Sequence, residues 1–248
     1  MIQYDRQQNI LSLLSRKGSA TIKEIAEEVF ASEASVRRDI SRLESEGLVR
    51  KVYGGVILSD YKNSAVPLAL RQSDNSRSKE AIASMAASRV KNGSILILDA
   101  SSTVARMIKY LGGARDLRII TNSLSVLDEI SKLGNPEIRA YCTGGELDVS
   151  EKAFFGPSSE NYLASVSADA VFFSSQGISE DGEISDASER ETSLRRVMLS
   201  RAREKIFLCD SSKVGARKMF TLCHRESISE IICDAPLPWD KEETKNHK

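Results

Sequence analysis

Apolar residues recur with two different spacings along this 248-residue chain, which predicts two domains. Up to about residue 57, helical spacing predicts short helices over residues 3–17 and 21–30 and a longer helix that begins after Ser32. From residue 79 onward, short apolar runs alternate with helical patterns, which is typical of a mostly parallel sheet. The predicted strands are 94–99, 117–121, 137–143, 170–175, 205–210 and 230–233. The expected fold class is α/β, with an N-terminal winged helix-turn-helix joined to a larger α/β domain.

The helix that begins after Ser32 has an outer face of arginine and small residues. Ser32 can cap this helix, and Val36, Ile40 and Leu43 share its inward face. The outer face carries Ala34, Ser35, Arg38, Ser41, Arg42 and Ser45, whereas the acids are expected on the flanks: Glu33, Asp39, Glu44 and Glu46. Arginine can pair with guanine and serine can bond bases or phosphates, so this face suits a DNA major groove.

The segments before and after this helix complete a DNA-binding motif. Residues 21–30 and the following helix, joined at Ala31–Ser32, predict a helix-turn-helix. Gly47 ends the second helix, and LVRKVYGGVIL predicts a two-stranded basic wing. A structural three-helix module could carry similar surface arginines, but the combination favours binding of double-stranded DNA. The candidate DNA-binding residues are Thr21, Ser32, Ala34, Ser35, Arg37, Arg38, Ser41, Arg42, Arg50, Lys51 and Tyr53.

The run S-x-x-S-V-R-R-D-I-x-R-L-E-x-x-G-L-V-R-K-V-Y-G-G extends from Ser32 to Gly55. It resembles the N-terminal signature of the DeoR family of bacterial transcriptional regulators. The resemblance covers about the first quarter of the chain and implies a DNA operator as partner. Tyr53 stands where the family usually has His, and Phe30–Ala31 is unusual at the turn, but neither change removes a groove-facing group.

The total charge does not add to the DNA prediction. The chain has 35 basic and 35 acidic residues, and residues 1–60 alone have nine of each. The prediction therefore depends on where the charges lie. A near-neutral protein gains affinity by pairing two DNA-binding heads on paired half-sites, so we expect a homo-oligomer, either a dimer or a tetramer.

Composition shifts set the expected domain boundaries. They are 1–57 for the winged helix-turn-helix, 58–78 for a linker or connecting helix interrupted by Pro67, 79–235 for the α/β domain, and 236–248 for a charged tail expected to be disordered. The four cysteines have no metal-type spacing and are expected as free thiols, so no metal or cofactor is expected. No signal peptide or membrane-spanning run is visible, so the expected location is the cytoplasm, with no membrane partner.

Three predicted strands end in polar segments. They are Asp99–Thr103, Thr121–Ser123 and Thr143–Glu146, the last with the paired glycines Gly144–Gly145. In open α/β sheets, ligands bind at the carboxyl ends of strands, where helix N-termini present unpaired N–H groups. Ser and Thr often cap helices for structural reasons alone, but three polar ends at one sheet edge favour a ligand pocket.

The second half resembles the C-terminal effector domain of DeoR regulators, which is similar to the fold of ribose-5-phosphate isomerase. The matching stretches include LDASST, TNSL and Asp210–Lys213. The resemblance implies a phosphorylated sugar or polyol as the effector that changes operator affinity. It also implies that Lys79, Ser101, Ser102 and Thr103 hold the phosphate, that Asp99, Asn122 and Gly144 line the cavity, and that Glu191, Arg195 and Lys213 face the sugar. Thr121 and Gly145 complete the candidate effector set.

Two residues depart from that family pattern. Ser101 stands where the family usually has Gly, and its side chain narrows the phosphate loop or adds a donor. Arg195 stands where the family usually has Lys; arginine keeps the cation but cannot shuttle a proton, because its pKa stays too high. Glu191 and Arg195 are also spaced as an i,i+4 surface pair.

The leading hypothesis is therefore a DNA-binding repressor that responds to a sugar phosphate. Two other functions stay open. The α/β domain could serve oligomerisation only, or it could be an isomerase-like enzyme in which Asp99 or Glu191 acts as the base. His224 and His247 give no convincing catalytic pair, so no catalytic residue is assigned.

Overall fold

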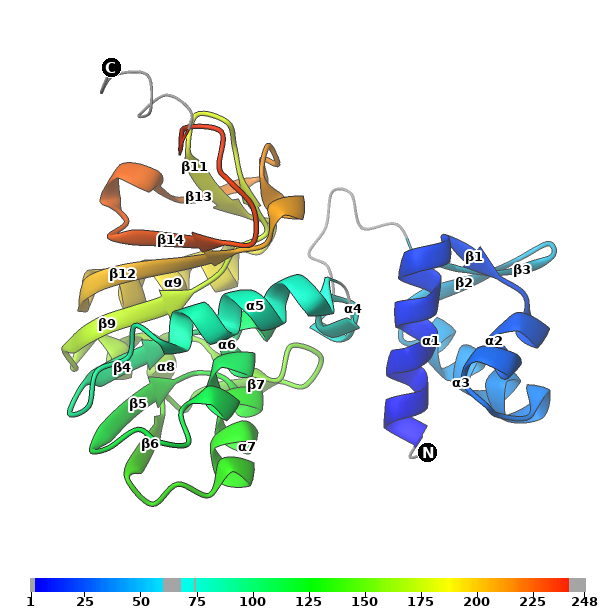
Figure 1. Cartoon of the computed structure of the whole chain (residues 1–248), viewed down its shortest axis with the longest axis horizontal. Helices are drawn as coiled ribbons and strands as arrows, with labels where there is room; N and C mark the ends of the chain where they lie inside the picture. Colours follow the sequence, from blue (N-terminus) through cyan, green and yellow to red (C-terminus); the bar gives the residue numbers. More distant parts are fainter. Residues whose placement is uncertain (1–2, 60–67, 74, 241–248) are drawn as a thin grey trace. The chain divides into compact units, whose positions relative to one another are not determined.

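The structure, a computed structural model, describes residues 3–59, 68–73 and 75–240 (Figure 1). The chain divides into two compact units, Met1–Ser76 and Arg77–Lys248. Each unit has its own hydrophobic core, so each is described by itself. Among the described residues, no helix is both long enough and apolar enough to cross a bilayer.

The N-terminal unit packs its helices on a three-stranded sheet. Ile10, Leu14, Ile25, Val36 and Ile40 have no exposed surface, and together they form the centre of this core. The strands pair in the order β1-β3-β2, all antiparallel, so that β2 and β3 form a hairpin wing. The elements are α1 (Gln3–Lys17), β1 (Ser19–Ala20), α2 (Ile22–Glu28), α3 (Glu33–Ser45), β2 (Val49–Val52), β3 (Gly55–Leu58) and α4 (Leu68–Ser73).

The position of Asp39 differs from the sequence-based expectation. Asp39 was expected on a flank of the long helix, but only 1% of it is exposed and it lies with the inward residues of α3. The guanidinium Nε of Arg6, on α1, donates to Asp39 Oδ2 at 2.5 Å. A buried carboxylate needs such a partner, because desolvation of an unpaired charge is costly. The ion pair therefore holds α3 against α1.

The larger unit is built on a six-stranded sheet in the order β14-β12-β9-β4-β5-β6, with every pair parallel. All six strands predicted from the sequence are present. Their bounds are β4 (Ile95–Leu98), β5 (Leu117–Thr121), β6 (Ile138–Cys142), β9 (Ala168–Phe173), β12 (Ala202–Cys209) and β14 (Glu230–Cys233). The strands read as apolar runs because helices cover the sheet on both faces.

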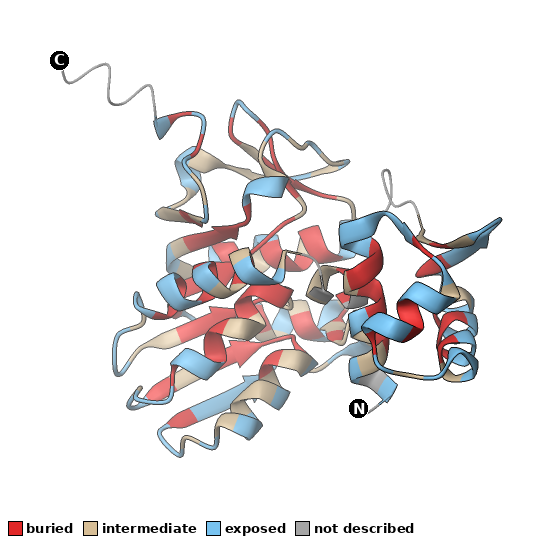
Figure 2. Cartoon of the chain, turned by 45° about the vertical axis from the view of Figure 1, so that its right-hand side comes forward, coloured by how far each residue is buried: buried red, intermediate tan, exposed pale blue. Residues whose placement is uncertain are grey.

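Two separate cores lie on the two faces of this sheet. One core includes Leu96 and Leu98, and the other includes Ile97, as the alternation of side chains along a strand requires. Figure 2 shows these buried residues along the strands and the inner sides of the helices. The helices α5 (Ser76–Ala87), α6 (Ser102–Met107) and α7 (Leu124–Leu133) contribute to the first core, and α8 (Pro157–Ala164) and α9 (Glu189–Ser200) to the second.

Several short elements are absent from the sequence-based prediction. They are the hairpin β7 (Glu146–Asp148) and β8 (Ala153–Phe155), and a small antiparallel sheet of β10 (Gly177–Ile178), β11 (Glu183–Asp186) and β13 (Phe220–His224). Single 3-10 turns occupy Ile108–Tyr110, Ser211–Lys213 and Arg225–Ser227. These short strands interleave polar and apolar residues, as in Glu183–Asp186, and so lack the continuous apolar run that predicted the strands of the main sheet.

The expected tail and linker also differ in part. Leu237 and Trp239 are buried in the second core, so the tail cannot begin at residue 236. Residues 241–248 lie outside the described residues. In the expected linker 58–78, residues 60–67 and 74 are likewise outside them, whereas 68–73 form α4, whose Leu70 packs into the N-terminal core.

Replacing Arg6 by alanine should destabilise the N-terminal unit, because it leaves Asp39 buried without its cation. The expected loss is roughly 2–3 kcal/mol, below the value for a fully buried pair, since the Arg6 side chain keeps some exposure. Arg16→Ala, which removes only the exposed pair with Glu28, should cost less than about 1 kcal/mol. Urea unfolding followed by circular dichroism tests this, while fluorescence of Trp239, the only tryptophan, reports the other unit. Equal losses for the two variants would contradict the assignment.

Candidate functional site

Side-chain caps determine where the two helices of the DNA-binding motif begin. Thr21 and Glu24 form a reciprocal capping box at α2: Glu24 N–H donates to Thr21 Oγ1 at 3.2 Å, and Thr21 N–H donates to Glu24 Oε2 at 2.8 Å. At α3, Ser35 N–H donates to Ser32 Oγ at 3.3 Å. Thr21 and Ser32, both predicted as DNA contacts, are thus also the N-cap residues of α2 and α3.

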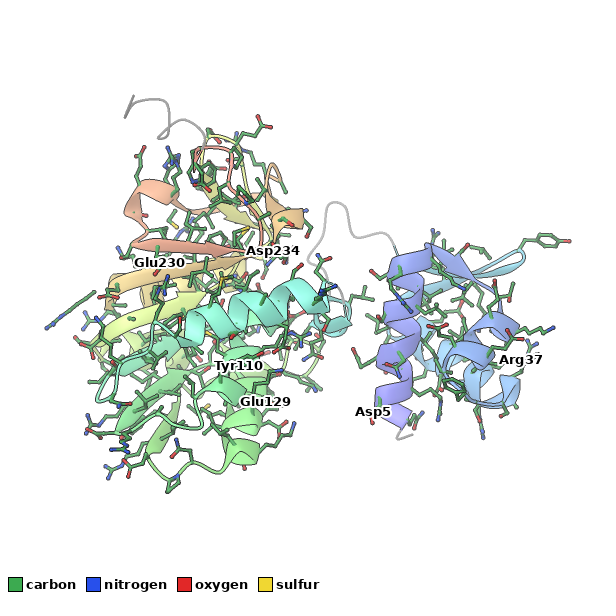
Figure 3. All side chains as sticks on the ribbon, viewed as in Figure 1. Asp5, Arg37, Tyr110, Glu129, Glu230 and Asp234 are labelled. Carbon is green, nitrogen blue, oxygen red and sulfur yellow. The ribbon has the colours of Figure 1, made fainter. Side chains whose placement is uncertain are left out.

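The arginines on the exposed side of α3 differ in their partners. Arg37 pairs with Glu33 at 3.3 Å and Arg42 pairs with Glu46 at 3.0 Å, each one turn away on the same helix. Arg38 instead donates to the neutral Ser35 Oγ at 3.3 Å, and among the described residues it has no carboxylate partner. Figure 3 shows Arg37 on the side of α3 that faces away from α1. Arg38 is the cation on this helix most available to an external acceptor.

A lysine of the wing connects β2 to α3 through hydrogen bonds. Lys51 Nζ donates to Glu44 Oε2 at 2.6 Å and to Ser41 Oγ at 3.2 Å. The hydrogen bonds that the side chain and the backbone N–H of Lys51 donate to Glu44 lower the pKa of that carboxyl. A surface hollow of about 400 Å³ lies beside these contacts, lined by residues of α2, α3 and the wing that include Arg37 and Ser41. The hollow therefore adjoins the exposed face of α3 and combines the polar side chains of Arg37, Ser41 and Lys51 with apolar ones of α2 and the wing.

Two aromatic side chains are exposed among the described residues of this unit. Tyr53 is fully exposed at the tip of the wing, and Phe30 is 91% exposed at the turn between α2 and α3. Phe30 has a φ of +50°, a left-handed conformation that is uncommon for a bulky residue. Its exposure agrees with the sequence-based remark that Phe30 is unusual at this turn.

In the larger unit, the strand order creates a switch point between β4 and β9. After β4 the chain adds β5 and β6 on one side, and after β9 it adds β12 and β14 on the other. Asp99, at the carboxyl end of β4, accepts hydrogen bonds from Ser174 N at 3.1 Å and from Ser101 N at 2.9 Å. Asp99 thus connects the carboxyl ends of β4 and β9, which is the position where ligands bind in open α/β sheets.

Arg195 of α9 is the centre of a buried ionic cluster at this position. Its guanidinium donates to Asp99 Oδ2 at 2.9 Å, to Asp186 Oδ2 at 2.6 Å and to Glu191 Oε2 at 3.0 Å. All four side chains are at most 7% exposed. Burial alone lowers the pKa of Arg195, but the three carboxylates outweigh burial and raise it above its usual range. The i,i+4 pair of Glu191 and Arg195 is therefore buried and not the surface pair considered from the sequence.

Some of the predicted effector residues line one small cavity. Asp99, Asn122, Glu191 and Arg195 surround it, together with apolar side chains such as Phe155. Its volume of about 10 Å³ has room for about one water molecule. Asn122 is 2% exposed; its Nδ2 donates to Phe154 O at 3.1 Å, but its Oδ1 has no hydrogen-bond partner in the part of the chain that the structure describes. The cavity is thus nearly closed and contains one unsatisfied acceptor.

Other predicted effector residues have structural partners outside this cavity. Ser101 Oγ caps α6 by accepting from Val104 N at 3.2 Å, and Thr121 Oγ1 accepts from Ser123 N at 3.0 Å. Ser102, Thr103 and Lys79 are buried, but they do not line the cavity. Lys213 Nζ donates to Ser174 Oγ at 2.8 Å, which puts this cation next to the residue that holds Asp99.

The paired glycines are required by local packing. A Cβ on Gly145 would lie 2.4 Å from Phe155 O and 2.6 Å from Ser159 Oγ, and its φ is +105°. Gly144 also has a positive φ, and its carbonyl accepts from Ser159 Oγ. These contacts account for both glycines without a ligand.

Two members of the cluster were absent from the sequence-based candidates. Asp186 is fully buried at the end of β11, and Ser174 follows β9. Ser174 could have been proposed, because it lies at the carboxyl end of the predicted strand 170–175. Asp186 had no such signal, since β11 was not predicted. Among the described residues, no group of three or more His, Cys, Asp or Glu side chains is arranged to hold a metal ion.

Arg195→Met should destabilise the larger unit by roughly 3–5 kcal/mol, because three carboxylates then lose their buried cation. Protonation relieves the buried charge, so the loss should be smaller at about pH 5 than at about pH 8. Arg196→Met removes an exposed neighbour that donates to Thr221 O and serves as the matched control. Thermal unfolding of both variants across this pH range measures the effect; a loss independent of pH would contradict it.

Comparison with known proteins gives the same family for both halves of the chain. Residues 6–62 match the model of the DeoR-like helix-turn-helix domain, and residues 74–235 match that of the DeoR C terminal sensor domain. The HTH-type transcriptional regulator GolR of Listeria innocua is 32% identical, over 94% of this chain and 91% of that protein. The lactose phosphotransferase system repressor of Staphylococcus epidermidis is 30% identical, over 94% and 93%.

A solved structure of ribose 5-phosphate isomerase A from Methanocaldococcus jannaschii overlaps 57% of this chain and 55% of that one, with 18% identity and a TM-score of 0.41. The overlap is partial and adds nothing to the fold derived from the strand order. The two family matches together cover nearly all described elements, and the relatives are similar over almost their whole length. The chain therefore belongs to the DeoR family of transcriptional regulators.

Proposed function

We propose that this protein is a cytoplasmic repressor of sugar or polyol metabolism genes. Its N-terminal unit binds an operator in double-stranded DNA, and a phosphorylated sugar bound to its α/β unit changes operator affinity. The observation that carries the proposal is the exposed face of α3, where Arg38 has no carboxylate partner among residues 3–59, 68–73 and 75–240. The printed name of the Staphylococcus epidermidis relative, a lactose phosphotransferase system repressor, supports the sugar-related role.

DNA recognition divides between α3 and the wing. We assign base contacts to Arg38, Ser41 and Arg42 on the exposed face of α3, because arginine and serine can bond to base edges in the major groove. Phosphate contacts are assigned to Arg50 and Lys51 of the wing. Of the α3 arginines, Arg37 and Arg42 must give up a carboxylate partner before they bind DNA, whereas Arg38 gives up only a serine hydroxyl.

Arg38→Ala should therefore weaken binding to a selected operator by about 5- to 150-fold, the cost of one bidentate arginine–guanine contact. A site obtained by selection from random duplex DNA and titrated by fluorescence anisotropy measures the effect. Arg118→Ala removes an exposed arginine of the other unit, which pairs with Asp116, and should leave affinity unchanged. Unaltered affinity of the Arg38 variant would remove the assignment of α3 as the reading helix.

The effector is assigned to the carboxyl end of the sheet at the switch point. Lys213 supplies a partly exposed cation there, and the unsatisfied Oδ1 of Asn122 can accept from a ligand hydroxyl. The cavity has to open before a sugar phosphate enters, which requires displacement of side chains around Arg195. An effector that binds the opened form better than the closed form would shift the population and couple the two sites.

A second candidate function follows from the small cavity volume. If the ionic cluster around Arg195 never opens, the α/β unit serves oligomerisation only. The isomerase-like alternative is weaker, because Arg195 cannot shuttle a proton and its guanidinium is already bonded to three carboxylates. Turnover of a pentose or hexose phosphate would favour it.

A thermal-shift screen with phosphorylated and unphosphorylated sugars separates these functions, because ligand binding stabilises the folded state by mass action. We expect one phosphorylated sugar or polyol to raise the melting temperature and to change operator affinity. Lys213→Met should abolish both responses while operator affinity without effector stays as it was. Lys218→Met, which replaces a half-buried lysine in the following loop, is the matched control. No response to any phosphorylated sugar would favour the oligomerisation-only function.

A further inference from the structure

The strand β6 is an open edge of the six-stranded sheet. It is last in the strand order and pairs only with β5 (Figure 1). Its residues from Arg139 to Cys142 are exposed, although parallel strands are usually covered on both faces. Figure 2 shows most of this strand in the colour of exposed residues. The other edge, β14, has only buried and half-buried residues. An exposed edge presents unpaired backbone groups that can pair with another chain.

The hydrogen-bond pattern shows which backbone groups of β6 point outward. Leu117 N–H donates to Glu137 O, and Thr143 N–H donates to Thr121 O, so the odd-numbered residues of this segment face β5. Alternation along the strand then directs the N–H and C=O groups of Ala140 and Cys142 away from β5. Ile138 N–H is used in a turn with Asn135 O, but its carbonyl points outward.

We propose that β6 pairs antiparallel with β6 of a second copy of this chain, about a two-fold axis at Ala140, and so joins two sheets into one. In this register, the two Ala140 residues exchange N–H and C=O bonds, and each Cys142 N–H meets the Ile138 carbonyl of the other copy. The small Ala140 side chain lets the strands approach at the axis. The interface is isologous, as a closed dimer requires.

The side chains of β6 are complementary in this register. Arg139 lies opposite Tyr141 of the second copy, and both project to the same face of the sheet, so each guanidinium can stack on a tyrosine ring. Charged residues on an edge often prevent pairing, but here the partner strand supplies a ring in place of a like charge. The same contact occurs twice, once on each side of the axis.

Antiparallel registers about the other outward-facing residues are excluded by the chain itself. An axis at Ile138 would place Ala140 opposite Pro136, which has no N–H to donate. An axis at Cys142 would place Ala140 opposite Gly144, where the backbone has already left the strand with a φ of +68°. The axis at Ala140 pairs all three outward-facing residues, Ile138, Ala140 and Cys142, within the strand.

A cross-link at the axis tests the pairing. In full-length protein with Cys142→Ser, the variant Ala140→Cys brings two thiols opposite each other in a hydrogen-bonded pair, at a Cα separation of about 5.5 Å that suits a disulfide. With a mild disulfide-forming oxidant, this variant should form covalent dimers at least about tenfold faster than Ser88→Cys in the same background. Ser88 is exposed and adjoins Arg89, which pairs with Glu230 of the opposite edge.

A second variant tests the same interface without a cross-link. Tyr141→Arg places like charges opposite each other and should raise the dimer dissociation constant at least about tenfold by analytical ultracentrifugation. Tyr141→Phe keeps the ring and should dimerise as the native chain does. A native chain that stays monomeric, an Ala140→Cys variant that cross-links no faster than Ser88→Cys, or an unchanged Tyr141→Arg dimer would each overturn the proposal. These results do not depend on which effector or operator the protein binds.

Discussion

One guanidinium organises the carboxyl edge of the α/β sheet. Arg195 bonds to Asp99 after β4, to Asp186 at the end of β11 and to Glu191 on its own helix, so it connects the main sheet, the small sheet and α9. Asp99 in turn binds the backbone after β9. Three carboxylates and one cation leave an excess of negative charge in a buried site, which makes this cluster sensitive to any ligand that adds donors or cations.

The N-terminal unit uses the same kind of interaction. The buried carboxylate of Asp39 is held by Arg6, and this pair fixes the orientation of α3 on α1. In both units, a buried carboxylate on one element forms an ion pair with an arginine on another element. A packing that separated the two side chains would leave a buried charge unpaired. The capping residues Thr21 and Ser32 add to this order by setting the first turn of each helix. The exposed face of α3 is thus presented by a rigid support, which a reading helix requires.

Sequence patterns were sufficient to predict the elements in which apolar side chains recur at a regular spacing or form a continuous run. The inward residues Val36, Ile40 and Leu43 predicted α3, and the apolar runs predicted the six parallel strands. Asp39 was misplaced because a helical wheel puts it next to Leu43, and only the distant Arg6 makes its burial possible. Asp186 was missed because β11 has no apolar run to mark it as a strand, and its partner Arg195 lies nine residues away on a different element.

The candidate site was harder to predict than the fold, because the same residue types serve structure and ligand binding. Ser101 and Thr121 are at the predicted strand ends, but their side chains accept backbone N–H groups. Gly145 has no side chain because Phe155 and Ser159 leave no space for one. Which polar groups remain free depends on contacts between distant segments, as the unsatisfied Oδ1 of Asn122 shows.

The ion pairs on α3 and the wing have a thermodynamic consequence for DNA binding. Arg37, Arg42 and Lys51 each carry a carboxylate partner on the protein, whereas Arg38 and Arg50 have none among the described residues. A cation that moves from its own acid to a phosphate releases an ion from the DNA but leaves an acid that attracts a cation from solution. Each such pair reduces the net release of counterions, so log K falls less steeply with log salt concentration than the number of cations on this surface would give. The full salt dependence then belongs to cations without a carboxylate partner among the described residues, such as Arg38 and Arg50.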